Sequence, residues 1–208
     1  MRFLLLGQFD GFVILGLVLL DWGLQQQHDW VAGLGLSLAL IKPQLGLPLA
    51  TYFLLRRRRF WPLLVLAGIA VLSILLWPGW PRDLLTRLQQ EPPIRLGNVS
   101  LWPFMGSGAL LLWLPATLLP MPPARRQTLL AATSALALPY FQSHSLMLLY
   151  VMPIGLLPLL ANIGFLSVLG NESALTLQAV VPMGVYVWMV GLTARELWGR
   201  LHSGAPSH

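Results

Sequence analysis

The sequence contains no cysteine and very little charge. Without cysteine, the chain forms no disulfide and has no thiolate site for a metal. Charged residues make up 10% of the chain, whereas a soluble domain carries about 25%, and hydrophobic residues make up 56%. The length of 208 residues corresponds to one ordinary domain. This composition excludes a soluble globule, a nucleic-acid-binding module and a disordered tail, and it indicates a membrane protein.

Long stretches of the chain, at residues 60–81, 96–124 and 127–171, contain no charged side chain. As a helix, the last of these would extend more than about 60 Å, roughly twice the thickness of a membrane's hydrocarbon layer. Because the apolar runs are continuous, they indicate helices. We therefore predict an all-α, polytopic helical bundle, with residues 1–208 as a single transmembrane domain of about seven apolar segments. The segments are residues 3–20, 31–55, 60–77, 104–119, 128–141, 146–169 and 177–197.

The arginines lie at the ends of these segments, where the positive-inside rule expects them. The net charge of +6 therefore does not indicate a nucleic-acid partner. Two clusters, at residues 56–59 and 125–126, are predicted to lie in the cytoplasm. Residues 80–101 are then predicted to form an external segment that contains a short amphipathic helix at 81–88. The predicted location is the plasma (inner) membrane, which the chain crosses several times.

A proline interrupts the second apolar segment. Residues 31–55 are long enough to span a membrane once, yet Lys42-Pro43 lies at their centre. Proline removes a backbone donor and disfavours helix at the residue before it. The segment is therefore either one kinked span or two half-length helices of about 11 residues, roughly 17 Å each, that meet at Lys42-Pro43.

Lys42 is the sharpest candidate for a binding residue. It is the only lysine among 13 basic residues, and it lies within an apolar segment. Polar side chains at membrane depth are functional candidates, and an ammonium is a compact partner for a phosphate. The structural alternative is that Lys42 pairs with a buried acid such as Asp10, or extends its ammonium to the membrane surface.

Other polar residues in apolar surroundings are candidates for the lining of a substrate cavity: Gln8, Asp10, Asn98, Ser100 and His144. For Asp10 the alternative is a helix cap. For the element that contains Asn98 and Ser100 it is an interfacial cap, and for His144 it is a structural histidine with satisfied hydrogen bonds. The sequence has no zinc-type histidine spacing, phosphate-binding glycine loop or nucleophile elbow, so we predict no metal and no cofactor.

Several of these residues belong to short elements that follow one another in a defined order. The elements are Gly7-Gln8-x-Asp10, Ala32-Gly33, Lys42-Pro43-Gln44, an arginine run before Phe60-Trp61, Gly97-Asn98-Val99-Ser100-Leu101, and Leu138-Pro139 to His144.

This order resembles glycosyltransferase family 87, whose members are membrane mannosyltransferase-like proteins of the GT-C clan. Val99 departs from the glutamine of the family's Gly-Asn-Gln-Ser-Leu element. Residues 140–143 depart considerably from its Ser-Pro-x-Ser-Trp-x-His element. The resemblance covers about residues 6–153. It implies a GT-C-like bundle that transfers a sugar, mannose in the first instance, from a polyprenyl-phosphate donor to an acceptor outside the cytoplasm.

The resemblance also implies roles and partners. Lys42 is expected to bind the donor phosphate, and the lining residues are expected to border the sugar. The family's catalytic acidic residue lies upstream of the Gly-Gln element, so the chain is expected to correspond to the C-terminal half of such an enzyme, and its catalytic residues are not assigned. Expected partners are a polyprenyl-phosphate sugar lipid, membrane lipids and a separate N-terminal half, with no nucleic acid. The alternative function is a non-catalytic membrane subunit or a transporter-like protein with a polar cavity at Lys42-Pro43.

Overall fold

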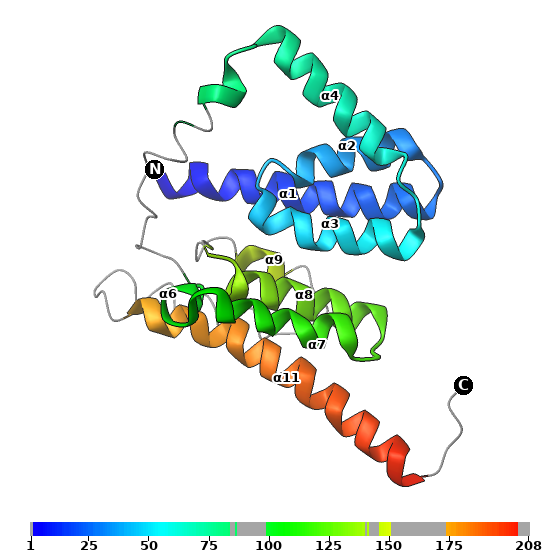
Figure 1. Ribbon diagram of the computed structural model, residues 1–208, viewed down its shortest axis with the longest axis vertical. Coiled ribbons are helices and arrows are strands. Elements are labelled where there is room, and N and C mark those ends of the chain that lie inside the picture. Colours follow the sequence, from blue (N-terminus) through cyan, green and yellow to red (C-terminus); the bar gives the residue numbers. More distant parts are fainter. Residues whose placement is uncertain are drawn as a thin grey trace. The chain divides into compact units, whose positions relative to one another are not determined.

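A computed structural model of the chain describes residues 2–83, 86, 99–139, 141, 146–150 and 174–203. Every regular element within these ranges is a helix, so the all-α prediction is confirmed there. The chain divides into two compact units, Met1–Gly97 and Asn98–His208 (Figure 1). The single transmembrane domain over residues 1–208 stays a prediction.

None of the helices in the described ranges has both the length and the apolar character that crossing a membrane requires. The polytopic arrangement therefore stays a prediction as well.

The first unit is built on three helices that pack against one another, α1 (Arg2–Gln25), α2 (Asp29–Ala39) and α3 (Pro43–Arg57) (Figure 1). A fourth helix, α4 (Pro62–Leu76), packs against α2. Apolar residues at helical spacing bury one face of α1. They are Val13, Leu17, Leu20 and Leu24.

Glycines allow α1 and α2 to approach closely. A Cβ atom at Gly35 would overlap the backbone of Leu20 and the carbonyl oxygen of Gly16. Nearer the turn between the helices, a Cβ at Gly23 would lie 2.6 Å from the backbone nitrogen of Ala32. These pairings run in opposite directions along the two helices, so α1 and α2 are antiparallel.

The predicted break at Lys42-Pro43 separates two helices. α2 has 11 residues and ends at Ala39, and Pro43 is the first residue of α3. Lys42 is the N-cap residue, with non-helical φ and ψ of −129° and 83°. Proline fits the first helical position because the backbone donor that it lacks would have no partner there. The two-helix alternative is thus confirmed. However, α3 has 15 residues, because it continues to Arg57 and ends only where Arg58 turns left-handed.

The second unit surrounds α8 (Pro123–Ala137), whose residues 128–137 are all buried. α8 packs against η1 (Gly106–Leu112), α7 (Trp113–Leu118), α9 (Met147–Tyr150) and α11 (Ala174–Ser203). A one-turn helix, α6 (Trp102–Met105), precedes η1.

The predicted segment at 104–119 consists of short pieces instead of one helix. α6 ends at Gly106, which has a positive φ of 55°, a conformation that glycine adopts without strain. The next residues form the 3₁₀ helix η1, and α7 follows. Pro115 in α7 has no backbone donor, and its ring would collide with the carbonyl of Leu111 in a continuous α-helix. Proline and glycine therefore divide a stretch that is uniformly apolar.

The other predicted segments are described to different extents. Residues 128–137 lie in α8, and residues 177–197 lie within α11. Of the segment at 146–169, residues 151–169 lie outside the described residues. In the predicted amphipathic helix at 81–88, residues 81–83 and 86 are helical, whereas its three leucines lie outside the described residues.

Candidate functional site

An ion pair joins α1 to the break between α2 and α3. The Lys42 ammonium donates a hydrogen bond to Asp10 Oδ1 at 2.7 Å. The Asp10 side chain is completely buried, and that of Lys42 is 17% exposed. The structural alternative for Lys42, pairing with a buried acid such as Asp10, is therefore confirmed as a contact. Whether Lys42 also binds a phosphate stays a prediction.

The position of Asp10 follows from the helical periodicity of α1. Asp10 lies three residues before Val13, on the same buried face, and α1 begins at Arg2. The interpretation of Asp10 as a helix cap is therefore wrong, because Asp10 is an interior residue of α1 and does not stand at its start. Gln8 lies in the same helix, two residues before Asp10, and its role in lining a cavity stays a prediction.

The packing of the three helices places Lys42 opposite Asp10. Because α1 and α2 are antiparallel, the end of α2 returns to the level of Asp10 on α1. A Cβ atom at Gly46, in the first turn of α3, would overlap the carbonyl group of Ala39 at the end of α2. The chain at the break is therefore closely packed. Lys42 is itself a non-helical residue between the two helices.

In the second unit, residues 99–101 are hydrogen-bonded to the chain at and after the end of α8. The Val99 amide donates to the Phe141 carbonyl at 2.9 Å, and the Leu101 amide donates to the Leu136 carbonyl at 2.8 Å. Ser100 is buried, and its hydroxyl donates to the Leu136 carbonyl and accepts from the Trp102 amide. These bonds join two elements that lie about 40 residues apart in the sequence.

The candidate residues on these two elements are only partly described. Asn98 and His144 lie outside the described residues. Ser100 is described, and the two hydrogen bonds of its hydroxyl hold the backbone at the start of α6. Its role in lining a cavity stays a prediction, as do those of Asn98 and His144.

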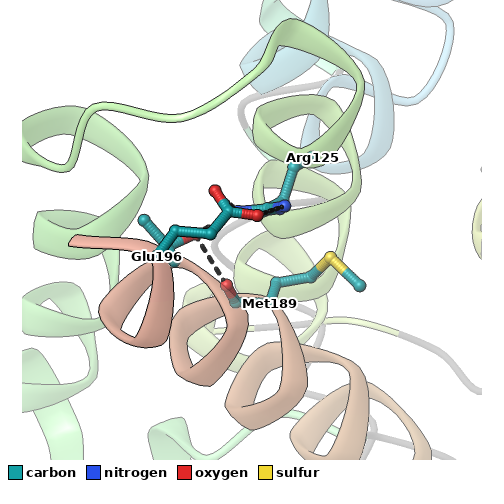
Figure 2. Close-up of polar contacts among 4 residues, drawn as sticks. Arg125, Met189 and Glu196 are labelled. Atoms are coloured by element: carbon teal, nitrogen blue, oxygen red, sulfur yellow. Dashed lines mark hydrogen bonds and ion pairs between the residues drawn. The ribbon is translucent and has the colours of Figure 1, made fainter. Parts of the chain in front are cut away.

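An arginine of the second unit makes a contact that the sequence analysis did not anticipate. Arg125, in the first turn of α8, donates to both oxygens of Glu196 on α11, at 2.6 and 2.9 Å (Figure 2). It also donates to the Thr193 hydroxyl at 3.2 Å, and that hydroxyl donates to the Met189 carbonyl (Figure 2). Hydrogen bonding to Glu196 raises the pKa of the Arg125 guanidinium above its ordinary value, so Arg125 stays charged. The available sequence signal was Glu196 itself, a carboxylate at the end of the last apolar segment.

The Arg125–Glu196 contact predicts a measurable effect on stability. Glu196→Gln should lower the melting temperature slightly, because it removes a bidentate, charge-assisted contact at a half-exposed position. Arg195→Gln, a charge change on the same exposed helix surface, is the matched control. Thermal unfolding at low and high salt should show a larger decrease for Glu196→Gln, and the difference should shrink at high salt. Equal effects of the two substitutions would contradict this contribution.

The described residues do not contain a group of three or more metal-ligating side chains of His, Cys, Asp or Glu. In the first unit, the Lys42–Asp10 pair places an ammonium at the helix break, and an ammonium is a compact partner for a phosphate.

The fold and this pair define a helical protein with a lysine held at a helix break. The sequence model of glycosyltransferase family 87 matches residues 1–161. The chain belongs to glycosyltransferase family 87, as the sequence analysis predicted. The matched residues include both partners of the Lys42–Asp10 pair, whereas α11 lies beyond them. No curated protein and no solved structure matches the chain.

Proposed function

We propose that the chain is a membrane glycosyltransferase, or part of one, that uses a polyprenyl-phosphate sugar, mannose in the first instance, and an acceptor outside the cytoplasm. The family membership supports glycosyl transfer. The observation that carries the proposal is the Lys42–Asp10 pair, since a buried carboxylate holds the protein's only lysine at a break between helices. In this proposal Lys42 binds the donor phosphate and Asp10 positions the ammonium.

The role of Lys42 follows from the charge that develops during transfer. The bond between the sugar's anomeric carbon and the phosphate oxygen breaks, and a bond to the acceptor oxygen forms. The acceptor hydroxyl loses its proton to a general base, and the polyprenyl phosphate leaves with increased negative charge. An ammonium fixed beside the phosphate stabilises that charge without reorganising during the reaction. We assign no carboxylate of this chain as the base.

The surface of α4 supports a membrane location. Of the residues in this helix, only Pro62 is buried, and many of its large apolar side chains are exposed. Four arginines precede the helix at residues 56–59, and Trp77 follows it. Arginine at one end and tryptophan at the other are typical of a helix that contacts lipid. The most exposed apolar side chains of α4 are Leu64, Val71, Leu72, Leu75 and Leu76.

The proposed orientation can be measured with reporters. A topology reporter fused after Arg59 or after Arg126 should report the cytoplasm, because arginine clusters are retained on that side. A reporter placed within residues 82–97 should report the outside. Accessibility of Arg87 from the cytoplasm would overturn the orientation.

Donor binding tests the proposed function directly. The full chain in lipid nanodiscs should bind polyprenyl-phosphate mannose, and unlabelled donor should displace a labelled donor. The same polyprenol without its phosphate is the control, and it should not compete. The alternative of a non-catalytic subunit, which the break between α2 and α3 also accommodates, predicts no preference for the phosphate-linked sugar. Absence of that preference would refute the proposal.

A further inference from the structure

An open groove lies at the turn between α3 and α4, away from the Lys42–Asp10 pair. It is lined by Arg58, Arg59, Phe60, Trp61 and Leu64. Arg58 ends α3 in a left-handed conformation, with φ of 52°, and α4 begins at Pro62. The 15 residues of α3 separate this turn from Lys42 by about 22 Å along the helix axis. The groove is therefore a different place from the proposed donor site.

The groove carries excess positive charge. Arg59 donates to Asp29 Oδ2 at 2.8 Å, and this pair holds the turn against the start of α2. Among the described residues, Arg56, Arg57 and Arg58 make no ion pair. The Asp29 carboxylate contacts this turn, and Asp21, the carboxylate nearest to it in the sequence, accepts a hydrogen bond from Gln25. Arg58 is thus exposed and available to an anion from solution or from the membrane.

Apolar and aromatic side chains line the groove beside the guanidinium groups. Trp61 is 64% exposed, Leu64 is 60% exposed and Phe60 is 49% exposed. Tryptophan is enriched at the level of lipid headgroups, because its ring is apolar and its N–H is polar. A guanidinium binds phosphate oxygens through a planar fork of donors. The groove therefore offers a phosphate contact next to a surface for acyl chains.

We infer that this groove binds the headgroup of an anionic membrane phospholipid. Arg58 contacts the phosphate, while Trp61, Leu64 and the exposed face of α4 contact the glycerol and the acyl chains. A zwitterionic headgroup fits less well, because its cationic group meets Arg58, which has no acidic partner in the described residues. The inference rests on the membrane location in the proposed function, and it is independent of glycosyl transfer.

The experiment compares two neighbouring arginines in the full chain. Wild-type protein in mixed micelles should retain phosphatidylglycerol in preference to phosphatidylcholine, measured by native mass spectrometry. Arg58→Gln should weaken phosphatidylglycerol binding about tenfold, the effect of losing one charge-assisted contact. Arg57→Gln makes the same change in charge at a residue that does not line the groove, and it should retain near wild-type binding. Trp61→Ala should also weaken binding, because it removes the apolar wall.

Other results would contradict either the lipid site or the proposed function. Equal losses in Arg57→Gln and Arg58→Gln would indicate diffuse charge attraction and overturn the site. So would equal retention of the two lipids by the wild type. Displacement of phosphatidylglycerol by millimolar inorganic phosphate would show a site for free phosphate instead, and would also overturn the inference. Binding of polyprenyl-phosphate mannose should be unchanged in Arg58→Gln, and its absence from all variants with lipid binding intact would count against the proposed function alone.

Discussion

Lys42→Ala should destabilise the protein by about 3–5 kcal/mol, because it leaves the buried Asp10 carboxylate without its ammonium partner. An unpaired charge in a buried position loses its hydration and gains no compensating interaction. Chemical denaturation, followed by circular dichroism, would measure the change in unfolding free energy. The same substitution should also weaken binding of polyprenyl-phosphate mannose by roughly 1.5–3 kcal/mol, because it removes a charge-assisted contact to the phosphate.

A double substitution separates these two effects. In Asp10→Asn/Lys42→Ala no buried charge is stranded, so most of the lost stability should return. Donor affinity should remain low, because the phosphate still lacks its cation. If the double variant regains both stability and donor affinity, Lys42 serves only to neutralise Asp10, and the phosphate-binding role fails.

Lys42→Arg completes the series. It keeps the positive charge but replaces a compact ammonium with a wide planar fork. We expect partial recovery of both stability and donor affinity relative to Lys42→Ala. Full donor affinity with the arginine would show that the site needs only a positive charge at this position. It would contradict the expectation that the phosphate site requires a compact ammonium.

Gly35→Ala should destabilise the first unit by about 1–3 kcal/mol, the usual cost of overpacking. The added Cβ would overlap the backbone of α1 at Leu20 and Gly16, so the two helices must move apart. Because the same packing brings the end of α2 to the level of Asp10, donor binding should weaken as well. Thermal or chemical unfolding measures the first effect, and donor titration measures the second.

Gly68→Ala is the matched control for this prediction. Gly68 lies on α4, and a Cβ there would have no neighbour within 4 Å among the described residues. Alanine should therefore stabilise this helix by roughly 0.5–1 kcal/mol through its higher helix propensity. Equal effects at Gly35 and Gly68 would show that α1 and α2 do not approach as closely as the structure indicates.

The sequence indicated the break in the first unit but left open whether it divides two helices or kinks one span. Proline acts on its own residue and on the one before it, so the break at Lys42-Pro43 was visible locally, as was the 11-residue length of α2. The division of residues 104–119 into short helices was not predicted, because the prediction followed hydrophobicity and this stretch is uniformly apolar. Hydrophobicity does not show where Gly106 and Pro115 interrupt the helical hydrogen bonding. The extent of α3 was also underestimated, since its end depends on the left-handed turn at Arg58.

Composition and local pattern determined the helical class and indicated the break that presents Lys42, because these depend on residues close together in the sequence. The order of short elements along the chain indicated the family. Only the tertiary structure decided which partner each charged side chain has. Lys42 and Asp10 are 32 residues apart, Arg59 and Asp29 are 30 apart, and Arg125 and Glu196 are 71 apart. Such pairs form where close helix packing brings distant turns to the same level, and in the first unit that packing depends on the absent Cβ atoms of Gly16 and Gly35.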